Sequence, residues 1–288
     1  MSSRTGSAPS RGTGARLDRA LESLRERGRI GIMAHMIYGY PSPGESEAIA
    51  SALVRAGADL VEVQVPFSDP TADGPVITEA CQRALDAGAR VAGAFGFLET
   101  ATRRHDVPFL VMTYLNVAFA YRRAGGAGGS GVAGGPSEGL RAFVEDAARA
   151  GAAGIIIPDL PPEQRQEGYV EACRDSGVHP IWVISPNISD RRLGLIRDVA
   201  SGLVYSTSRT GTTGKEMALE LEGLRRFLAR AREALRLPLA VGFSISKREH
   251  VEALAGHAEV AVVGTHLLRA FDAGRIQGLE EELRRLGG

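Results

Sequence analysis

Three acidic side chains stand close together in one short segment of the chain. Glu62 lies inside the apolar run of residues 60–65, and Asp69 and Asp73 follow it in a loop that also carries three prolines. A buried carboxyl group is costly unless it is paired, hydrated or protonated, so Glu62 indicates a polar cavity at the end of a strand. Carboxyl groups in such cavities act as general acids and bases, which makes Glu62 and Asp73 candidates for proton transfer.

Each of these acids also has a purely structural interpretation. Glu62 could cap a backbone group or pair with an arginine. Asp69 could cap a turn, and Asp73, which precedes Gly74 and Pro75, could N-cap the short helix expected near Val76. The residues alone leave these alternatives open.

Glycine-bearing turns in the last third of the chain form a second candidate site. They read GTTG at residues 211–214, GFSIS at 242–246 and GT at 264–265, and the first and last lead into expected helices. Unpaired backbone N–H groups and the positive end of a helix dipole bind phosphate at such places. The pattern predicts a phosphate ester as substrate, whereas glycines that merely make turns are the alternative.

These loops need a scaffold that brings distant segments together. Each expected strand is preceded by a Gly- or Pro-bearing turn and followed by a helical pattern, for example 45–56, 139–150, 163–176, 217–235 and 247–255. Apolar, β-rich runs recur eight times, at residues 30–38, 60–65, 108–114, 154–157, 180–184, 203–205, 238–241 and 260–263. Eight β/α units in 288 residues predict an α/β fold with a single closed (β/α)8 TIM barrel. A doubly wound open sheet is the alternative, because strand count alone does not show closure.

The same pattern predicts the domain organisation. Residues 1–16 are polar and rich in Arg, Ser and Gly, as expected of a disordered tail, and an extra N-terminal helix starts at Leu17. Residues 17–288 form the barrel domain, with a Gly-rich insertion at about 124–139. Five glycines stand where helices should end in the left-handed conformation: Gly57, Gly88, Gly151, Gly177 and Gly256.

Composition excludes several classes of function. The 34 basic and 34 acidic residues give no net charge, so we expect no nucleic-acid partner. No apolar run reaches the roughly 20 residues of a membrane helix, so no membrane association is expected. Cys81 and Cys173 are far apart and lack metal-ligand spacing, which favours two buried thiols in a reduced, cytoplasmic setting and no metal site.

Two motif matches and two histidines carry no function by themselves. GAGGSG at residues 126–131 fits the dinucleotide pattern but lies in the Gly-rich insertion, and GTTGKE at 211–216 lacks the first glycine and the Ser or Thr of a P-loop. His35 and His266 are expected near the barrel mouth without ligands at metal spacing, so packing or hydrogen-bonding roles are favoured.

The motifs, taken in order, resemble the tryptophan synthase alpha subunit family. The most specific is PFSDPTADGP, residues 66–75, in the loop with the acids. It is followed in family order by YLNVAFAY, IIIPDLPPEQ, VYSTSRTGTTG, VGFSIS and VVGTHLL. Together these segments cover nearly everything from Ile30 to the C-terminal helix.

The resemblance implies cleavage of indole-3-glycerol phosphate into indole and glyceraldehyde 3-phosphate, without metal or cofactor in this subunit. Glu62 and Asp73 match the two catalytic acids, one acting as acid and then base, the other stabilising charge at the indole nitrogen. The matching substrate-binding positions are Tyr205, Thr213, Tyr114 and Phe243, the last two in the indole pocket and Thr213 on a closing loop. The matching phosphate-binding positions are Gly214, Ser244, Gly264 and Thr265.

The resemblance also implies a partner, a pyridoxal-phosphate beta subunit in an alpha2-beta2 heterotetramer. Asn116 matches an interface residue, and the Gly-rich insertion lies near the expected docking face. Further departures from the family are Gln64 in place of Gly, Tyr40 in place of Asp and Ser244 in place of Gly. Two alternatives to the heterotetrameric enzyme therefore stay open: a standalone lyase that releases indole, and a non-catalytic subunit that activates a beta subunit.

Overall fold

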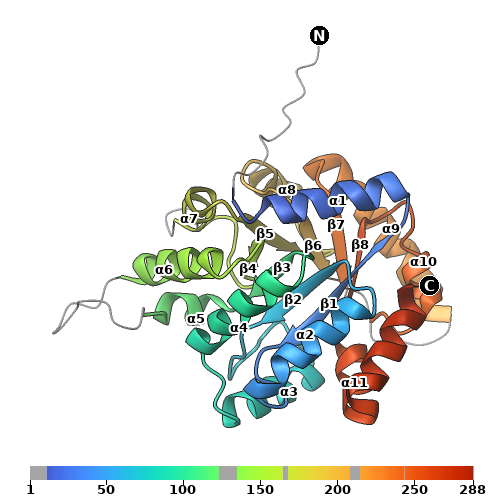
Figure 1. The fold of residues 1–288 in the computed structure, drawn as a ribbon. Coiled ribbons are helices and arrows are strands. Elements are labelled where there is room, and N and C mark those ends of the chain that lie inside the picture. Colours follow the sequence, from blue (N-terminus) through green and yellow to red (C-terminus); the bar gives the residue numbers. More distant parts are fainter. Residues whose placement is uncertain (1–11, 123–134, 165–167, 208–214, 243, 288) are drawn as a thin grey trace.

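The structure, a computed structural model, describes residues 12–122, 135–164, 168–207, 215–242 and 244–287 (Figure 1). Its eight strands form a closed parallel barrel in which each strand pairs with the next and β8 pairs with β1. The strands are β1 (Gly31–Ile37), β2 (Leu60–Gln64), β3 (Phe109–Met112), β4 (Gly154–Ile156), β5 (His179–Ile184), β6 (Val204–Thr207), β7 (Leu239–Gly242) and β8 (Val260–Val263). The predicted barrel is confirmed, and the open sheet is wrong.

Helices surround the barrel and alternate with its strands (Figure 1). They are α1 (Ala15–Arg27), α2 (Ser46–Arg55), α3 (Pro75–Asp86), α4 (Val91–Arg104), α5 (Leu115–Ala120), α6 (Pro136–Arg149), α7 (Tyr169–Ser176), α8 (Asp190–Arg197), α9 (Lys215–Leu235), α10 (Arg248–Glu252) and α11 (Thr265–Gly287), with a short 3-10 turn at Pro43–Glu45. In the part of the chain that the structure describes, no helix is both long enough and apolar enough to cross a membrane.

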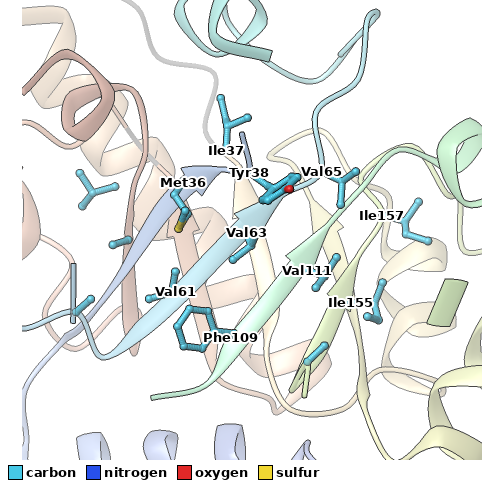
Figure 2. Close-up of a cluster of buried hydrophobic side chains, with 14 of the residues drawn as sticks. Met36, Ile37, Tyr38, Val61, Val63, Val65, Phe109, Val111, Ile155 and Ile157 are labelled. Carbon is cyan, nitrogen blue, oxygen red and sulfur yellow. The ribbon is translucent and has the colours of Figure 1, made fainter. Parts of the chain in front are cut away.

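Side chains alternate along each strand between two apolar layers. On β2, Val61 and Val63 belong to the cluster between the sheet and the helices, where Figure 2 shows them beside Val111 and Phe109 of β3. Leu60 belongs instead to the cluster inside the barrel. Because strand side chains alternate with a period of two, Glu62 and Gln64 share the inward face with Leu60. Two polar residues near the end of one strand thereby enter the barrel.

Helix α1 packs against the amino ends of the strands. Its Leu17, Leu21 and Leu24 are buried in the same cluster as Leu60 and other residues of the barrel interior. Gly31 at the start of β1 makes room for this helix, since a Cβ there would lie 2.4 Å from Leu24 Cδ1. The predicted extra N-terminal helix is confirmed, and it fills the end of the barrel opposite the carboxyl ends of the strands.

The five glycines predicted to end helices adopt positive φ angles. These are Gly57 (100°), Gly88 (90°), Gly151 (98°), Gly177 (69°) and Gly256 (76°). At Gly151 the requirement is also steric, because a Cβ would lie 2.3 Å from Thr102 Oγ1, whose hydroxyl donates to the Ala150 carbonyl. This part of the glycine excess belongs to the barrel architecture.

Several sequence-based boundaries differ from the structure. Helix α1 begins at Ala15 and not at Leu17, so it includes the last two residues of the predicted tail 1–16. The helix expected at 163–176 begins at Tyr169, because Gly168 has a φ of 73° that a right-handed helix does not accept. The insertion expected at about 124–139 overlaps α6, which begins at Pro136. Gly139 belongs to this helix and packs closely on α5, since a Cβ there would lie 2.2 Å from the Phe119 carbonyl oxygen.

Candidate active site

A cavity of about 550 Å³ opens at the carboxyl ends of the strands, where barrel enzymes place their chemistry. Its apolar walls come from the inward-facing ends of β3, β4, β5 and β8. These wall residues are Met112, Ile156, Val183 and Val262. Its polar lining includes His35, Glu62, Asp73, Tyr205, Thr207, Ser244, Thr265, His266 and Arg269. The cavity is thus apolar on one side and rich in titratable groups on the other.

Glu62 is 3% exposed and lies beside a histidine. The parallel register of β1 and β2 sets His35 opposite Glu62, and His35 Nδ1 lies 3.4 Å from Glu62 Oε2. Burial by itself lowers the pKa of His35, but the Glu62 carboxylate, and more weakly Asp73, raise it above the ordinary value of 6.5. The only carboxyl inside the described strands therefore has a titratable neighbour within ion-pair distance.

Asp73 is held by two hydrogen bonds to the same oxygen. Gln64 Nε2 donates to Asp73 Oδ2 over 2.7 Å, and the Tyr114 hydroxyl donates to the same atom over 2.8 Å. Among the described residues no hydrogen bond reaches Oδ1. The N-cap residue of α3 is Gly74, with no side-chain cap, so the capping role considered for Asp73 is wrong. The carboxylate is oriented with one oxygen left for a ligand.

Tyr114 lies behind Asp73 and does not line the cavity. It is 1% exposed, and its hydroxyl also accepts the Ala72 N–H over 3.0 Å. Its ring packs on Phe67 with centroids 5.3 Å apart. Burial and then the Asp73 carboxylate raise the pKa of Tyr114, so the hydroxyl stays protonated and donates to Asp73. This position differs from the indole-pocket wall that the resemblance implies.

Tyr205 projects into the cavity from β6. Burial and then the Glu62 and Asp73 carboxylates raise its pKa well above 10.0, so it remains a hydrogen-bond donor. Gly242 on the neighbouring β7 leaves space for it, because a Cβ at this glycine would lie 3.0 Å from the Tyr205 hydroxyl. A neutral phenol therefore faces the two acids.

The other end of the cavity meets the start of a helix. Ser244, Gly264 and Thr265 line it, and Thr265 is the first residue of α11. Arg269, one turn further along α11, is exposed and also lines the cavity. The free N–H groups and the dipole of a helix N-terminus favour an anion, and a guanidinium adds a full positive charge.

A hydrogen-bonded network links this end to the second half of α11. His266 Nε2 lies 2.9 Å from Glu282 Oε2, and Arg285 contacts Glu282 and donates to the Ser246 carbonyl over 2.9 Å. The loop after β7 is thereby tied to the helix that follows β8. The hydrogen-bonding role favoured for His266 is confirmed.

Three of the predicted residues fall outside the described part of the chain, and one candidate acid lies away from the cavity. Thr213, Gly214 and Phe243 are outside the described residues. Asp69 is exposed and accepts a hydrogen bond from the adjacent Ser68 hydroxyl, 2.5 Å away. No group of three or more His, Cys, Asp or Glu side chains that could hold a metal ion occurs among the described residues.

Tyr40, one of the departures from the family, is buried outside the cavity lining. Its hydroxyl donates to Asp272 of α11 over 2.5 Å and accepts from Arg83 of α3 over 2.9 Å. Burial and the Asp272 carboxylate raise the pKa of Tyr40 to about 12. This tyrosine therefore joins the loop after β1 to two helices.

Sequence reasoning missed the neighbours of the two acids. Gln64 stood out only as a departure, His35 was not connected with Glu62, and Arg269 was not considered. The signal for the first two was present: Gln64 follows Glu62 by two residues on the same strand face, and His35 lies in the first predicted strand, next to the second. What the sequence lacked was the register that aligns the strands.

A closed parallel barrel whose mouth holds one buried and one half-buried carboxyl group opposite a helix N-terminus defines a (β/α)8-barrel enzyme of the acid–base type, with an anion-binding end. The comparisons with known proteins give the family. Residues 21–287 match the family described as tryptophan synthase alpha chain. The chain belongs to the tryptophan synthase alpha chain family.

Individual relatives agree with this assignment. The tryptophan synthase alpha chain of Desulforapulum autotrophicum is 39% identical over 259 residues, which cover 89% of this chain and 95% of the relative. The tryptophan synthase structure of Mycobacterium tuberculosis superposes with a TM-score of 0.81 at 29% identity, covering 94% of this chain and 96% of the other. The alpha subunit of Legionella pneumophila gives 0.79 at 29%, covering 94% and 96%.

Proposed function

We propose that this protein cleaves indole-3-glycerol phosphate into indole and glyceraldehyde 3-phosphate in the last steps of tryptophan biosynthesis. The observation that carries the proposal is the placing of Glu62 and Asp73 in one cavity whose other end is the N-terminus of α11. An aromatic substrate with a phosphate tail needs both ends, an apolar pocket with acids and an anion site.

Glu62 is the proposed acid and base. Its proton goes to ring carbon C3 of the indole, which leaves a positive charge on the ring nitrogen. The carboxylate then takes the proton of the side-chain hydroxyl while the C–C bond breaks and its electrons return to the ring. One carboxyl group thus gives and regains a proton within each turnover.

Asp73 is the proposed partner of the ring N–H. Gln64 and Tyr114 both donate to Oδ2, which fixes the orientation of the carboxylate and leaves Oδ1 for the indole nitrogen. The positive charge that develops on this nitrogen is stabilised by a carboxylate that does not have to reorient. Tyr114 acts as a positioning residue in this arrangement.

The remaining roles follow the family resemblance. Gly214, Ser244, Gly264 and Thr265 are the proposed phosphate-binding residues. Tyr205 and Phe243 contact the substrate, and Thr213 hydrogen-bonds Asp73 when its loop closes over the site. The positions of Ser244, Gly264 and Thr265 around the start of α11 support the phosphate assignment.

We propose the partner and cofactor arrangement of the family. The chain pairs with a tryptophan synthase beta subunit in an alpha2-beta2 heterotetramer, pyridoxal phosphate belongs to that partner, and this subunit needs no cofactor of its own. Asn116, exposed at the start of α5, is a proposed contact residue. Whether the insertion permits docking decides between this complex and a standalone lyase.

Cellular location and domain boundaries are also proposals. Cys81 and Cys173 are free and buried, which fits the reducing cytoplasm. We propose a single catalytic domain; residues 1–11 of the predicted tail lie outside the described residues, and residues 15–16 belong to α1.

The test is indole release from indole-3-glycerol phosphate by the wild type and by Glu62→Gln, with and without a beta subunit. Activity that rises on mixing supports the heterotetramer, and activity that is strong alone and unchanged on mixing supports the standalone lyase. Silence alone and with the beta subunit, together with activation of that subunit, supports the non-catalytic alternative. Glu62→Gln should lower the rate by several orders of magnitude, whereas the exposed Glu79→Gln on α3 should change nothing. Wild-type turnover by Glu62→Gln refutes the assignment.

A further inference from the structure

His35 is a buried polar residue that the reaction described above does not use. It is 6% exposed, it lines the cavity, and its Nε2 has no hydrogen-bond partner among the described residues. Glu62 Oε2, the atom nearest to its Nδ1, likewise has no hydrogen bond within the described chain. Two buried titratable groups thus face each other over 3.4 Å, and the facing oxygen of Glu62 has no hydrogen bond among the described residues.

We infer that His35 and Glu62 share one proton at neutral pH, and that His35 is a positioning residue that stores the proton which Glu62 gives to the substrate. The inference rests on the proposed lyase function and names a group that function did not include. With one proton on the pair, the two forms are a neutral imidazole beside a carboxylic acid and an imidazolium beside a carboxylate. Passage between them moves a proton over a short distance without a net change of charge.

The two forms match the two halves of the reaction. The carboxylic acid form protonates ring carbon C3. After this transfer Glu62 is a carboxylate beside a neutral imidazole whose Nδ1–H can hydrogen-bond it through Oε2, which leaves Oε1 to receive the hydroxyl proton of the substrate. The proton count of the pair is the same before and after each turnover, so no external acid or base is required.

The surroundings of His35 favour this pair over others. The ring lies close to Gly264, the residue after β8, since a Cβ there would be 3.5 Å from it. Glu62 is the carboxylate at ion-pair distance, and Asp73 contributes more weakly to the raised pKa of His35. The titratable or charged groups that share the cavity with His35 are Glu62 on β2, Asp73 on the following loop, Tyr205 on β6, and His266 and Arg269 on α11.

The first experiment does not depend on activity. In the full chain labelled with ¹³C in its histidine rings, the His35 signal, assigned by its loss in His35→Gln, should titrate above pH 6.5. Glu62→Gln removes the carboxylate and leaves the burial, so the pKa of His35 should fall by about one unit or more. A His35 titration that Glu62→Gln leaves unchanged refutes the shared proton, whatever reaction the protein catalyses.

The second experiment measures kcat/KM for indole-3-glycerol phosphate against pH. A histidine ordinarily keeps its proton to higher pH than a carboxyl group does. The alkaline limb, which reports loss of the last proton of the pair, should therefore move to lower pH in His35→Gln. His105→Gln, on the barrel exterior beside Ser51, is the matched control with an unchanged profile. An alkaline limb that stays in place in folded His35→Gln refutes the inference. If His35→Gln does not fold, the His35 NMR signal is assigned instead by elimination, with single Gln variants of the other five histidines. The NMR titrations of the wild type and of Glu62→Gln then decide whether the proton is shared.

Discussion

Removing the hydrogen bonds to Asp73 should slow indole release without unfolding the protein. Tyr114→Phe deletes the donor 2.8 Å from Oδ2, and Gln64→Leu deletes the donor 2.7 Å from the same atom at nearly constant volume. Each bond is made to a carboxylate, and such bonds contribute about 1.5–3 kcal/mol. If that loss appears in the transition state, each variant lowers kcat/KM by about 10- to 150-fold.

The two donors should also be coupled, because they hold one oxygen. Either one alone keeps Asp73 near its position, so the double variant should lose more than the product of the two single effects. The expected coupling in a double-mutant cycle is about 0.5–3 kcal/mol. The assay is the initial rate of indole release at several substrate concentrations, with the loss expected in kcat more than in KM.

Tyr121→Phe provides the matched control. The Tyr121 hydroxyl donates to Asp146 Oδ2 over 2.7 Å, a bond of the same kind on the outside of the barrel. This variant should lower the midpoint of thermal unfolding and leave kcat/KM unchanged. The reasoning about Asp73 is refuted if Tyr114→Phe and Gln64→Leu each stay within about twofold of the wild type, far less than one charge-assisted hydrogen bond.

Two further predictions concern the amino end of the barrel. Leu17→Ala should destabilise the protein by about 2–5 kcal/mol in urea unfolding, because Leu17 is fully buried in the cluster inside the barrel. Glu26→Ala, at an exposed position of the same helix, should have little effect. Loss of kcat in folded Leu17→Ala would contradict the separation of the amino end of the barrel from the cavity. Burial lowers the pKa of His179 below 6.5, although the nearby Asp18 opposes this. The unfolded chain therefore binds the proton more readily, and the free energy of unfolding falls as pH drops below about 6.5. His179→Gln should flatten the dependence of the free energy of unfolding on pH in this range, and an unchanged slope would contradict the assignment.

The barrel could be predicted because its evidence is local and repeated. Each strand is an apolar run of consecutive residues. Each helix that ends at a glycine with positive φ, such as Gly57 or Gly256, can likewise be recognised from a few consecutive residues. Glu62 could be singled out for the same reason, since one acid in an apolar strand is visible without a structure. The start of α7 could not be placed, because helical periodicity before Gly168 does not show that the backbone turns there.

The contacts that define the site depend on distant parts of the chain. Tyr114 is 41 residues from Asp73, and only the closed sheet and the course of the loop after β2 bring the hydroxyl to Oδ2. His35 meets Glu62 because β1 and β2 pair in one particular register. For Asp73 the sequence allowed both a helix-capping role and a catalytic role. The structure excludes the capping role, because the N-cap residue of α3 is Gly74. Pairing register and loop path arise from packing of the whole domain, so no local pattern contains them.

The position of α1 has a practical consequence for work with this protein. This helix lies at the amino ends of the strands, whereas the cavity lies at their carboxyl ends, and a strand of five residues such as β2 spans about 17 Å. A fusion partner, a surface tether or a fluorescent label introduced at the exposed face of α1 is therefore separated from the substrate by the length of the barrel strands. The protein can be immobilised through α1 while substrate approaches freely from the opposite end.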